Sequence, residues 1–301
     1  MPELPDIEVY LDALRERIEG RKLLGIRLGS PFLLRSVDPP IADAVGRRIT
    51  ALRRLGKRIV FELEDDLYLV LHLMIAGRLR WNDPGAKLPG KLGLAAFDFE
   101  PGSLIVTEAS KKKRASLHVV RGSAGLDEHD PGGIDPLTSG AKEFAAALCA
   151  KTHTLKRALT DPSILSGVGN AYSDEILHAA RLSPFKRTDR IDSDELERLG
   201  LAIVQVMHDW LTRLREERGK GFPMKVTAFR EGMAVHGRYG EPCPVCASPV
   251  QRLVYAANEA NYCATCQTSG KLLADRALSR LLKKDWPKSL EELEQRRSQK
   301  I

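Results

Sequence analysis

The 301-residue sequence predicts a multi-domain α+β protein, with a strand-rich first domain, a helical second domain and a cysteine-rich segment near its end. Three observations predict this order. Short β-branched and aromatic runs, separated by turn residues, fill residues 22–120. Apolar residues then recur near the helical period from 141 to 235. Four of the five cysteines gather between Cys243 and Cys266 in two C-x-x-C pairs.

Residues 1–122 are predicted to form a sandwich or barrel-like domain that begins with one helix. The helix is expected over 5–19, because Pro5 suits a first turn, Gly20 suits a stop and apolar residues share one face. The stretch KRIVFELEDDLYLVLHL (57–73) has the pattern of a β-hairpin, and further strands are expected around GRLRW, LAAFDFE and SLIVTE. Several antiparallel strands after one helix are typical of such folds.

Composition divides the rest of the chain into four segments. Gly, Pro, Asp and Ser crowd residues 123–140, which predicts a linker. A helical domain is expected over 141–235, and the cysteine segment occupies 236–267. The last segment, 268–301, is predicted to form two amphipathic helices separated by Pro287.

The charge balance favours a polyanionic partner. Lys and Arg number 47 and Asp and Glu number 40, which gives a net charge of +7. Nucleic acid is such a partner, although many basic proteins bind no polyanion. No apolar run is long enough to span a bilayer, and no basic segment followed by an apolar one marks a secretion signal. We therefore expect a cytoplasmic protein in reducing surroundings.

The cysteine pairs predict a structural metal ion. Cys243-Pro-Val-Cys246 and Cys263-Ala-Thr-Cys266 suit one Zn²⁺ held by four thiolates, with a β-hairpin in the spacer between them. All four ligand positions are filled by protein, which favours a structural over a catalytic role. Four thiolates also bind iron–sulfur clusters, and the spacing does not exclude that alternative. Cys149 is expected to be a small buried residue apart from this site.

Three further stretches are candidate phosphate contacts. A glycine turn leads into a predicted helix at Asn170, whose N-terminal N–H groups suit a phosphate, and Lys156 precedes it. Lys57 lies at the mouth of a strand, and SKKKR (110–114) is a run of cations. Each also has a structural interpretation. The glycine turn can be an ordinary helix–helix corner, Lys57 can be an edge lysine that discourages aggregation, and the run 110–114 can be a solvated face.

In combination, four motifs resemble the formamidopyrimidine-DNA glycosylase/endonuclease VIII (Fpg/Nei) family over residues 1–267. They are PELPD at the N-terminus, GK before a strand, GVGNAYSDE, and VHGRYGEPCPVC…YCATCQ, in that order. The resemblance implies an N-terminal β-sandwich with a flanking helix, a helix–two-turn–helix domain over 141–235 that binds DNA, and a zinc ribbon over 236–267. It also implies a bacterial-type monomer that acts on damaged DNA and requires neither a membrane nor a small-molecule cofactor.

The resemblance gives the N-terminus a catalytic role. Removing the initiator methionine frees the secondary amine of Pro2, which titrates near pH 8 and so has a neutral, nucleophilic fraction at physiological pH. The resemblance implies that this amine attacks C1′ of a damaged nucleoside, expels the base and forms an iminium ion that permits strand cleavage by β-elimination. Glu3 is then expected to move protons. By the same resemblance, Lys57, Lys156 and Asn170 grip phosphates around the flipped nucleotide.

The sequence departs from the family pattern in three places. At the tip of the ribbon hairpin, where the family usually carries an arginine that contacts DNA, this chain has Asn258 beside Glu259, and a carboxylate there repels phosphate. Ile75 takes the place of a wedge methionine, and TEASKKKRASL replaces a loop that carries an aromatic residue. The tail 268–301 runs beyond the usual end of the family. These changes leave lesion choice and lyase efficiency open.

Two alternatives remain at this point. The first is a catalytically weakened or inactive damaged-DNA-binding protein of the same fold, which Asn258 and Glu259 favour and which Pro2 and Glu3 oppose. The second is an interaction module whose C-terminal helices dock a partner. We expect instead that the apolar stripe of those helices packs on the protein's own domain.

Overall fold

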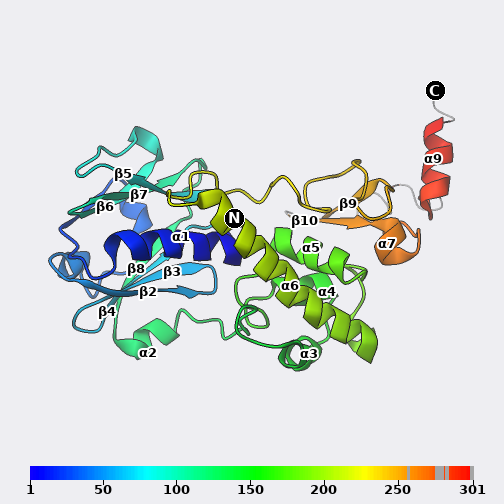
Figure 1. Cartoon of the computed structure of the whole chain (residues 1–301), viewed down its shortest axis with the longest axis horizontal. Helices are drawn as coiled ribbons and strands as arrows, with labels where there is room; N and C mark the ends of the chain where they lie inside the picture. The colour runs from blue at the N-terminus through cyan, green and yellow to red at the C-terminus, as the bar shows by residue number, and fades with distance from the viewer. Residues whose placement is uncertain (256–257, 275–280, 282–284, 299–301) are drawn as a thin grey trace. The chain divides into compact units, whose positions relative to one another are not determined.

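The computed structural model divides into two compact units (Figure 1). The residues that it describes are 1–255, 258–274, 281 and 285–298. One unit comprises Met1–Gly133 and His208–Ala228, and the other comprises Ile134–Met207 and Phe229–Ile301. Within the described ranges, no helix has both the length and the apolar character needed to cross a membrane.

The first unit is built on two four-stranded antiparallel sheets. Their strands are β1 (Gly25–Leu28), β2 (Ile49–Leu55), β3 (Arg58–Leu63), β4 (Leu67–His72), β5 (Gly77–Asn82), β6 (Gly93–Phe99), β7 (Gly102–Glu108) and β8 (Ser116–Arg121). One sheet has the order β1-β6-β7-β5 and the other the order β2-β3-β4-β8. Apolar side chains of both sheets share one core, in which Phe61 stacks on Phe97 with ring centroids 5.9 Å apart. The prediction of a β-sandwich is confirmed.

Helix α1 (Leu4–Ile18) packs along this sandwich (Figure 1). Ile7, Leu11 and Leu14, which the periodicity placed on one face, are all buried in the shared core. Polar groups then tie the helix to β2, because the Arg15 guanidinium donates to the Leu52 carbonyl at 3.0 Å. The helix therefore holds the N-terminal residues of the chain against the sandwich.

The segment predicted as a linker begins with a short helix, α2 (Gly122–Asp127). Leu126 is buried against Val60 and Val70, which lie on the face of the β2-β3-β4-β8 sheet away from the main core. The turn-forming composition of 123–140 hid this helix, since a single leucine is its buried anchor.

The second unit contains a helical part and a hairpin. Its elements are α3 (Ala141–Cys149), α4 (Leu155–Thr160), α5 (Asn170–Ala179), the first part of α6 (Ser193–Arg218), β9 (Val250–Tyr255), β10 (Asn258–Cys263), α7 (Ala264–Thr268) and α9 (Leu290–Ser298). Short 3-10 helices also occur at Pro31–Leu33, Ile41–Ala44 and Gly90–Leu92 in the first unit and at Thr188–Arg190 in the second. The antiparallel pair β9–β10 lies between the two cysteine pairs, where the sequence predicted a hairpin.

Cys149 is exposed, so the prediction that it is buried was wrong. It lies in the last turn of α3, and the side chains that this helix buries are those of Phe144 and Leu148.

The C-terminal segment folds back onto the hairpin. Lys271 and Ser289 form an antiparallel bridge, and Leu272 and Leu290 are buried in a cluster that includes Tyr262 of β10. The Tyr262 hydroxyl accepts a hydrogen bond from the Leu273 amide at 2.8 Å. This packing supports the expectation that the segment covers its own domain. The first of the two amphipathic helices expected there lies mostly outside the described residues, and the second is α9.

Candidate functional site

Three turns of the first unit gather at one end of the sandwich. Strand register pairs Arg58 with His72 and His72 with Ser116, and it also pairs Gly77 with Glu108. The β2–β3 turn with Lys57, the β4–β5 turn and the β7–β8 loop therefore emerge at the same edge. We call this end of the sandwich the turn edge.

The N-terminus lies at the turn edge. The charged groups that act on the Met1 amine include Glu3, Arg78 and Lys57, so the structure brings the N-terminus and Lys57 near one another. Burial is the main cause that lowers the pKa of this amine below its ordinary value of 8.0, and Arg78 and Lys57 lower it further while Glu3 opposes them. Pro2 follows directly and is buried. An amine in these surroundings is more often neutral at pH 7 than an exposed one.

Glu3 connects this terminus to α1. Its side chain is buried, and its backbone N–H donates to the Asp6 carboxylate at 2.9 Å, which satisfies one of the free N–H groups at the helix start. Pro5 lies in the first turn, where its missing N–H costs nothing. The residues next to the amine are thus held by the helix rather than by a loose tail.

Arg78 was missed by the sequence reasoning. Its guanidinium donates to the carbonyls of Ile75 at 3.1 Å and Val226 at 2.6 Å, so it braces the β4–β5 turn. The sequence signal was weak, because a single arginine that follows a glycine resembles any solvated strand residue. The turn itself is fixed by Gly77, where a Cβ atom would lie 2.2 Å from the Leu73 carbonyl oxygen. Ile75 is 59% exposed at this turn.

His72 lies beside the same turn as a neutral imidazole. Its Nδ1 accepts the Met74 N–H at 3.1 Å, which requires that this nitrogen carry no proton. Burial, with help from Arg58 and Lys57, lowers the pKa of His72 to about 4. The ring therefore stabilises the turn without adding positive charge near pH 7.

The β7–β8 loop presents the run of cations. Glu108 is 1% exposed, and its carboxylate accepts the backbone N–H groups of Arg114 at 2.9 Å and Ala115 at 3.1 Å. Lys111 and Lys112 are exposed on the loop that these bonds close. Neither takes part in an ion pair described for this structure, so both charges face solvent at the turn edge.

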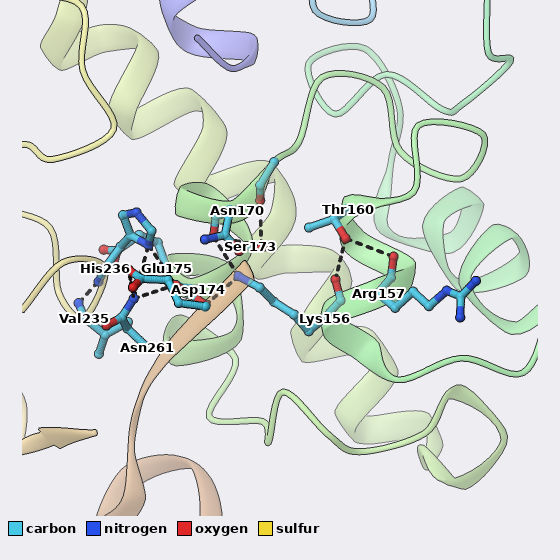
Figure 2. Close-up of polar contacts among 12 residues, drawn as sticks. Lys156, Arg157, Thr160, Asn170, Ser173, Asp174, Glu175, Val235, His236 and Asn261 are labelled. Atoms are coloured by element: carbon cyan, nitrogen blue, oxygen red, sulfur yellow. Dashed lines mark hydrogen bonds and ion pairs between the residues drawn. The ribbon is translucent and has the colours of Figure 1, made fainter. Parts of the chain in front are cut away.

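In the second unit, Asn170 is the first residue of α5 (Figure 2). Gly167 has a φ of +81°, and Gly169 in extended conformation precedes the helix, so the glycine turn is formed as predicted. The Lys156 side chain is only 3% exposed, and its Nζ lies 2.7 Å from the Asn170 carbonyl oxygen and 2.6 Å from Asp174 Oδ1. This burial does not fit the prediction that Lys156 contacts a phosphate, because the ammonium is turned into the protein.

The four predicted metal ligands come together. The Sγ atoms of Cys243, Cys246, Cys263 and Cys266 all lie within 4.8 Å of one another. The Cys243–Cys266 and Cys246–Cys263 sulfur separations are 3.9 and 3.4 Å. Four thiolates at about 2.3 Å from one tetrahedral zinc ion lie about 3.8 Å apart, so the donor set fits a single ion.

Asn258 is the first residue of β10 and pairs with Tyr255. Its side chain and residues 256–257 lie outside the described part of the structure. The neighbouring Glu259 carboxylate accepts from Asn261 Nδ2 at 3.2 Å. Sequence reasoning missed this contact and also missed the buried partners of Asp174, which are described below.

Comparison with known proteins covers each of these segments. Residues 1–116 match the family model of the formamidopyrimidine-DNA glycosylase N-terminal domain. Residues 133–216 match its H2TH domain, and residues 240–268 match a zinc finger found in FPG and IleRS. The zinc-finger match and the four clustered thiolates together identify the metal as one structural zinc ion.

Relatives in sequence point to the same family, and solved structures have a similar fold. The chain is 32% identical over 277 residues to a formamidopyrimidine-DNA glycosylase of Chloroflexus aurantiacus, an alignment that covers 89% of this chain and 98% of the relative. It is 42% identical over 151 residues to an uncharacterized formamidopyrimidine-DNA glycosylase-like protein of Mycobacterium tuberculosis, which covers 50% of this chain and 94% of that protein. The fold is similar to Lactococcus lactis Fpg in complex with DNA that contains an abasic site, with a TM-score of 0.79 at 24% identity over 88% of this chain and 99% of that one.

Proposed function

The chain belongs to the formamidopyrimidine-DNA glycosylase family, and from this premise we propose that it excises a damaged base from DNA and cleaves the strand at the resulting abasic site through the amine of Pro2. The protein is then a DNA repair glycosylase with abasic-site lyase activity. The observation that carries the proposal is the setting of the N-terminus, where burial and the cations Arg78 and Lys57 favour the neutral form of the Met1 amine. The Pro2 amine that removal of Met1 exposes is the next group along the chain and is buried at the same place.

The reaction uses the N-terminal residues in two steps. After removal of the initiator methionine, the Pro2 nitrogen forms a bond to C1′ as the bond from C1′ to the base breaks, and the departing base takes a proton that Glu3 can supply. The proline nitrogen loses its proton, and the C1′–O4′ bond of the sugar then breaks as O4′ takes up a proton, a transfer that Glu3 can also serve. The ring-opened product is a cationic iminium ion, which draws electrons and acidifies the 2′ proton. Loss of that proton expels the 3′ phosphate and cleaves the strand. Glu3 and Pro2 are held by α1, as catalysis by positioning requires.

DNA binding draws on positive charge at the turn edge and on the start of α5. We propose that Lys57 and the exposed Lys111 and Lys112 contact phosphates, and such contacts make affinity fall as salt rises. Asn170 offers an amide donor at a helix N-terminus, which suits an anion. We propose Asn258 as a further contact at the hairpin tip.

Borohydride trapping on abasic-site DNA tests the proposal. Reduction of the iminium ion joins protein to DNA, so the native chain with its methionine removed should give a covalent adduct. A chain that carries an N-terminal extension is the matched control, because its Pro2 nitrogen is then an amide and cannot attack. Equal trapping by the extended chain, or by Pro2→Gly, would contradict the proline mechanism.

A damaged-DNA-binding protein with weak or no catalysis is the second candidate. It is favoured by Asn258, which lacks the charge that the family usually carries at the hairpin tip. In that case the protein binds abasic-site DNA with salt-dependent affinity and gives no adduct on reduction.

We further propose that the protein acts as a monomer in the cytoplasm, on DNA of the bacterial nucleoid, and without a small-molecule cofactor. The bacterial origin of the relatives supports the setting. Sedimentation of the protein with and without DNA tests the first point, and retained activity after extensive dialysis tests the last.

A further inference from the structure

A buried carboxylate joins three segments of the second unit (Figure 2). Asp174 of α5 is 0% exposed at its side chain, and its Oδ1 pairs with Lys156 of α4 at 2.6 Å. Its Oδ2 lies 2.8 Å from His236 Nδ1 and 3.3 Å from Asn261 Nδ2, which belongs to β10. His236 and Asn261 are buried as well. One carboxylate therefore links α4, the segment before the first cysteine pair and the ribbon hairpin.

The orientation of Asn261 follows from this linkage. Its Nδ2 reaches two carboxylates, those of Asp174 and Glu259, at 3.3 and 3.2 Å. No described donor reaches its Oδ1, although that atom is buried. Leaving a buried acceptor unpaired is costly, so the attraction of the amide to the two carboxylates must outweigh that cost. The Asn261 side chain is therefore oriented by Asp174 and Glu259 together.

A second carboxylate fixes the position of His236. Glu175, next to Asp174 on α5, accepts the backbone N–H groups of Ala234 at 2.6 Å, Val235 at 3.0 Å and His236 at 2.9 Å. The imidazole is also stacked on Phe229, with ring centroids 5.6 Å apart. With its backbone and ring both held, His236 is a rigid link between Asp174 and the rest of its segment.

We infer that Lys156, Asp174, His236 and Asn261 form a positioning relay that fixes the first turn of α5 relative to strand β10. Lys156 donates to the Asn170 carbonyl at one end of the relay, and Asn261 lies three residues along β10 from Asn258 at the other. The inference rests on the proposed function, in which Asn170 and Asn258 meet DNA. Lys156 then acts on DNA affinity through Asn170 and makes no phosphate contact of its own.

Salt dependence separates a positioning residue from a phosphate contact. Removing one phosphate contact from a protein–DNA interface reduces the slope of log affinity against log salt by about 0.9. Lys156→Met keeps the length of the side chain and removes its charge, so a positioning role predicts weaker binding with an unchanged slope. The matched control is Arg157→Met, because Arg157 is the exposed next residue of α4 and is absent from the relay.

The experiment measures affinity, at several salt concentrations, for a duplex with a reduced, uncleavable abasic site. It also measures the melting temperature of each variant and its rate of borohydride trapping on DNA with an unreduced abasic site. Lys156→Met removes the ammonium that pairs with the buried Asp174 carboxylate, and we expect an affinity loss of about tenfold. The trapping rate at saturating protein should fall less than the affinity does. Adding Asp174→Asn neutralises the pair, so the double variant should recover most of the affinity and of the melting temperature.

Two results would overturn the relay. One is a double variant that regains its melting temperature but binds weakly with a shallower salt slope, which would make Lys156 a phosphate contact. The other is unchanged affinity in Lys156→Met. If the native chain binds no abasic-site DNA, the proposed function fails, and the relay is then judged on the melting temperatures alone. Strong coupling between the two substitutions supports it, and simple additivity contradicts it.

Discussion

Glu108 allows a direct test of how the turn edge is held together. Its carboxylate is 1% exposed and accepts the N–H groups of Arg114 and Ala115, which close the β7–β8 loop. The Oε2 atom accepts from both N–H groups, and Oε1 accepts a second bond from Arg114 at 3.1 Å. Glu108→Gln keeps the shape, and its one amide oxygen can take the place of Oε2. Both bonds then change from charged to neutral, at a cost of about 1 kcal/mol each. We expect the free energy of unfolding of the first unit to fall by about 2 kcal/mol.

The measurement is urea unfolding of the native chain and the variant, followed by a probe of the first unit. Trp81 serves as that probe, because it stacks on Phe99 in this unit. Glu100→Gln is the matched control, since Glu100 is 83% exposed at its side chain and pairs only at the surface with Arg21. Its effect should stay within about 0.5 kcal/mol.

Equal stability of the two glutamine variants would refute the reasoning. It would mean that the loop finds other acceptors at no cost, and that Glu108 does not anchor the cations that the loop presents. A loss in Glu108→Gln of about 2 kcal/mol, with no loss in the control, would support the anchoring role.

Four other predictions follow from the structure. The pKa of His72 is about 4 in the folded protein and about 6.5 in the unfolded chain, so the unfolded chain binds a proton first as the pH falls. The free energy of unfolding should therefore drop by up to about 3 kcal/mol between pH 7 and pH 4. His72→Gln should make the free energy of unfolding, measured by urea titration, depend less on pH over this range. Arg78 lowers the pKa of the Met1 amine, and we expect it to act in the same direction on the Pro2 amine after Met1 is removed, so Arg78→Met should slow trapping more at pH 7 than at pH 9. Cys263→Ser, or zinc removal by a chelator, should lower the melting temperature of the second unit and abolish DNA binding, with zinc content read by a metal dye. Leu290→Ala should lower the free energy of unfolding of the second unit by about 2 kcal/mol in chemical unfolding, and the metal dye should show unchanged zinc content.

The sequence predicts well what local pattern controls. The helix at the N-terminus, the antiparallel strands and the hairpin between the cysteine pairs all follow from periodicity and spacing. The four zinc ligands could be named because each C-x-x-C pair brings two thiolates together, and a hairpin brings the pairs together. Helix α2 was missed, since Leu126 is its single buried residue and carries no periodic signal.

Contacts between distant residues could not be predicted in this way. Lys156 resembles any basic residue on an amphipathic helix until the fold places Asp174 beside it. Arg78 and Glu108 gain their roles from strand pairing, which the sequence does not specify. Burial is the property that separates these residues from solvated ones, and it depends on the whole fold. The catalytic roles of Pro2 and Glu3 were predicted only through resemblance to a family, and they stay predictions.

The return of the C-terminal segment to the hairpin has a consequence for the order in which this protein is made. Leu290 covers apolar surface next to Tyr262, and it comes later in the chain than the whole hairpin. Chains are made from the N-terminus, and segments made earlier begin to fold first. The hairpin therefore keeps an uncovered apolar face until the segment that carries Leu290 has been made and has folded back onto it.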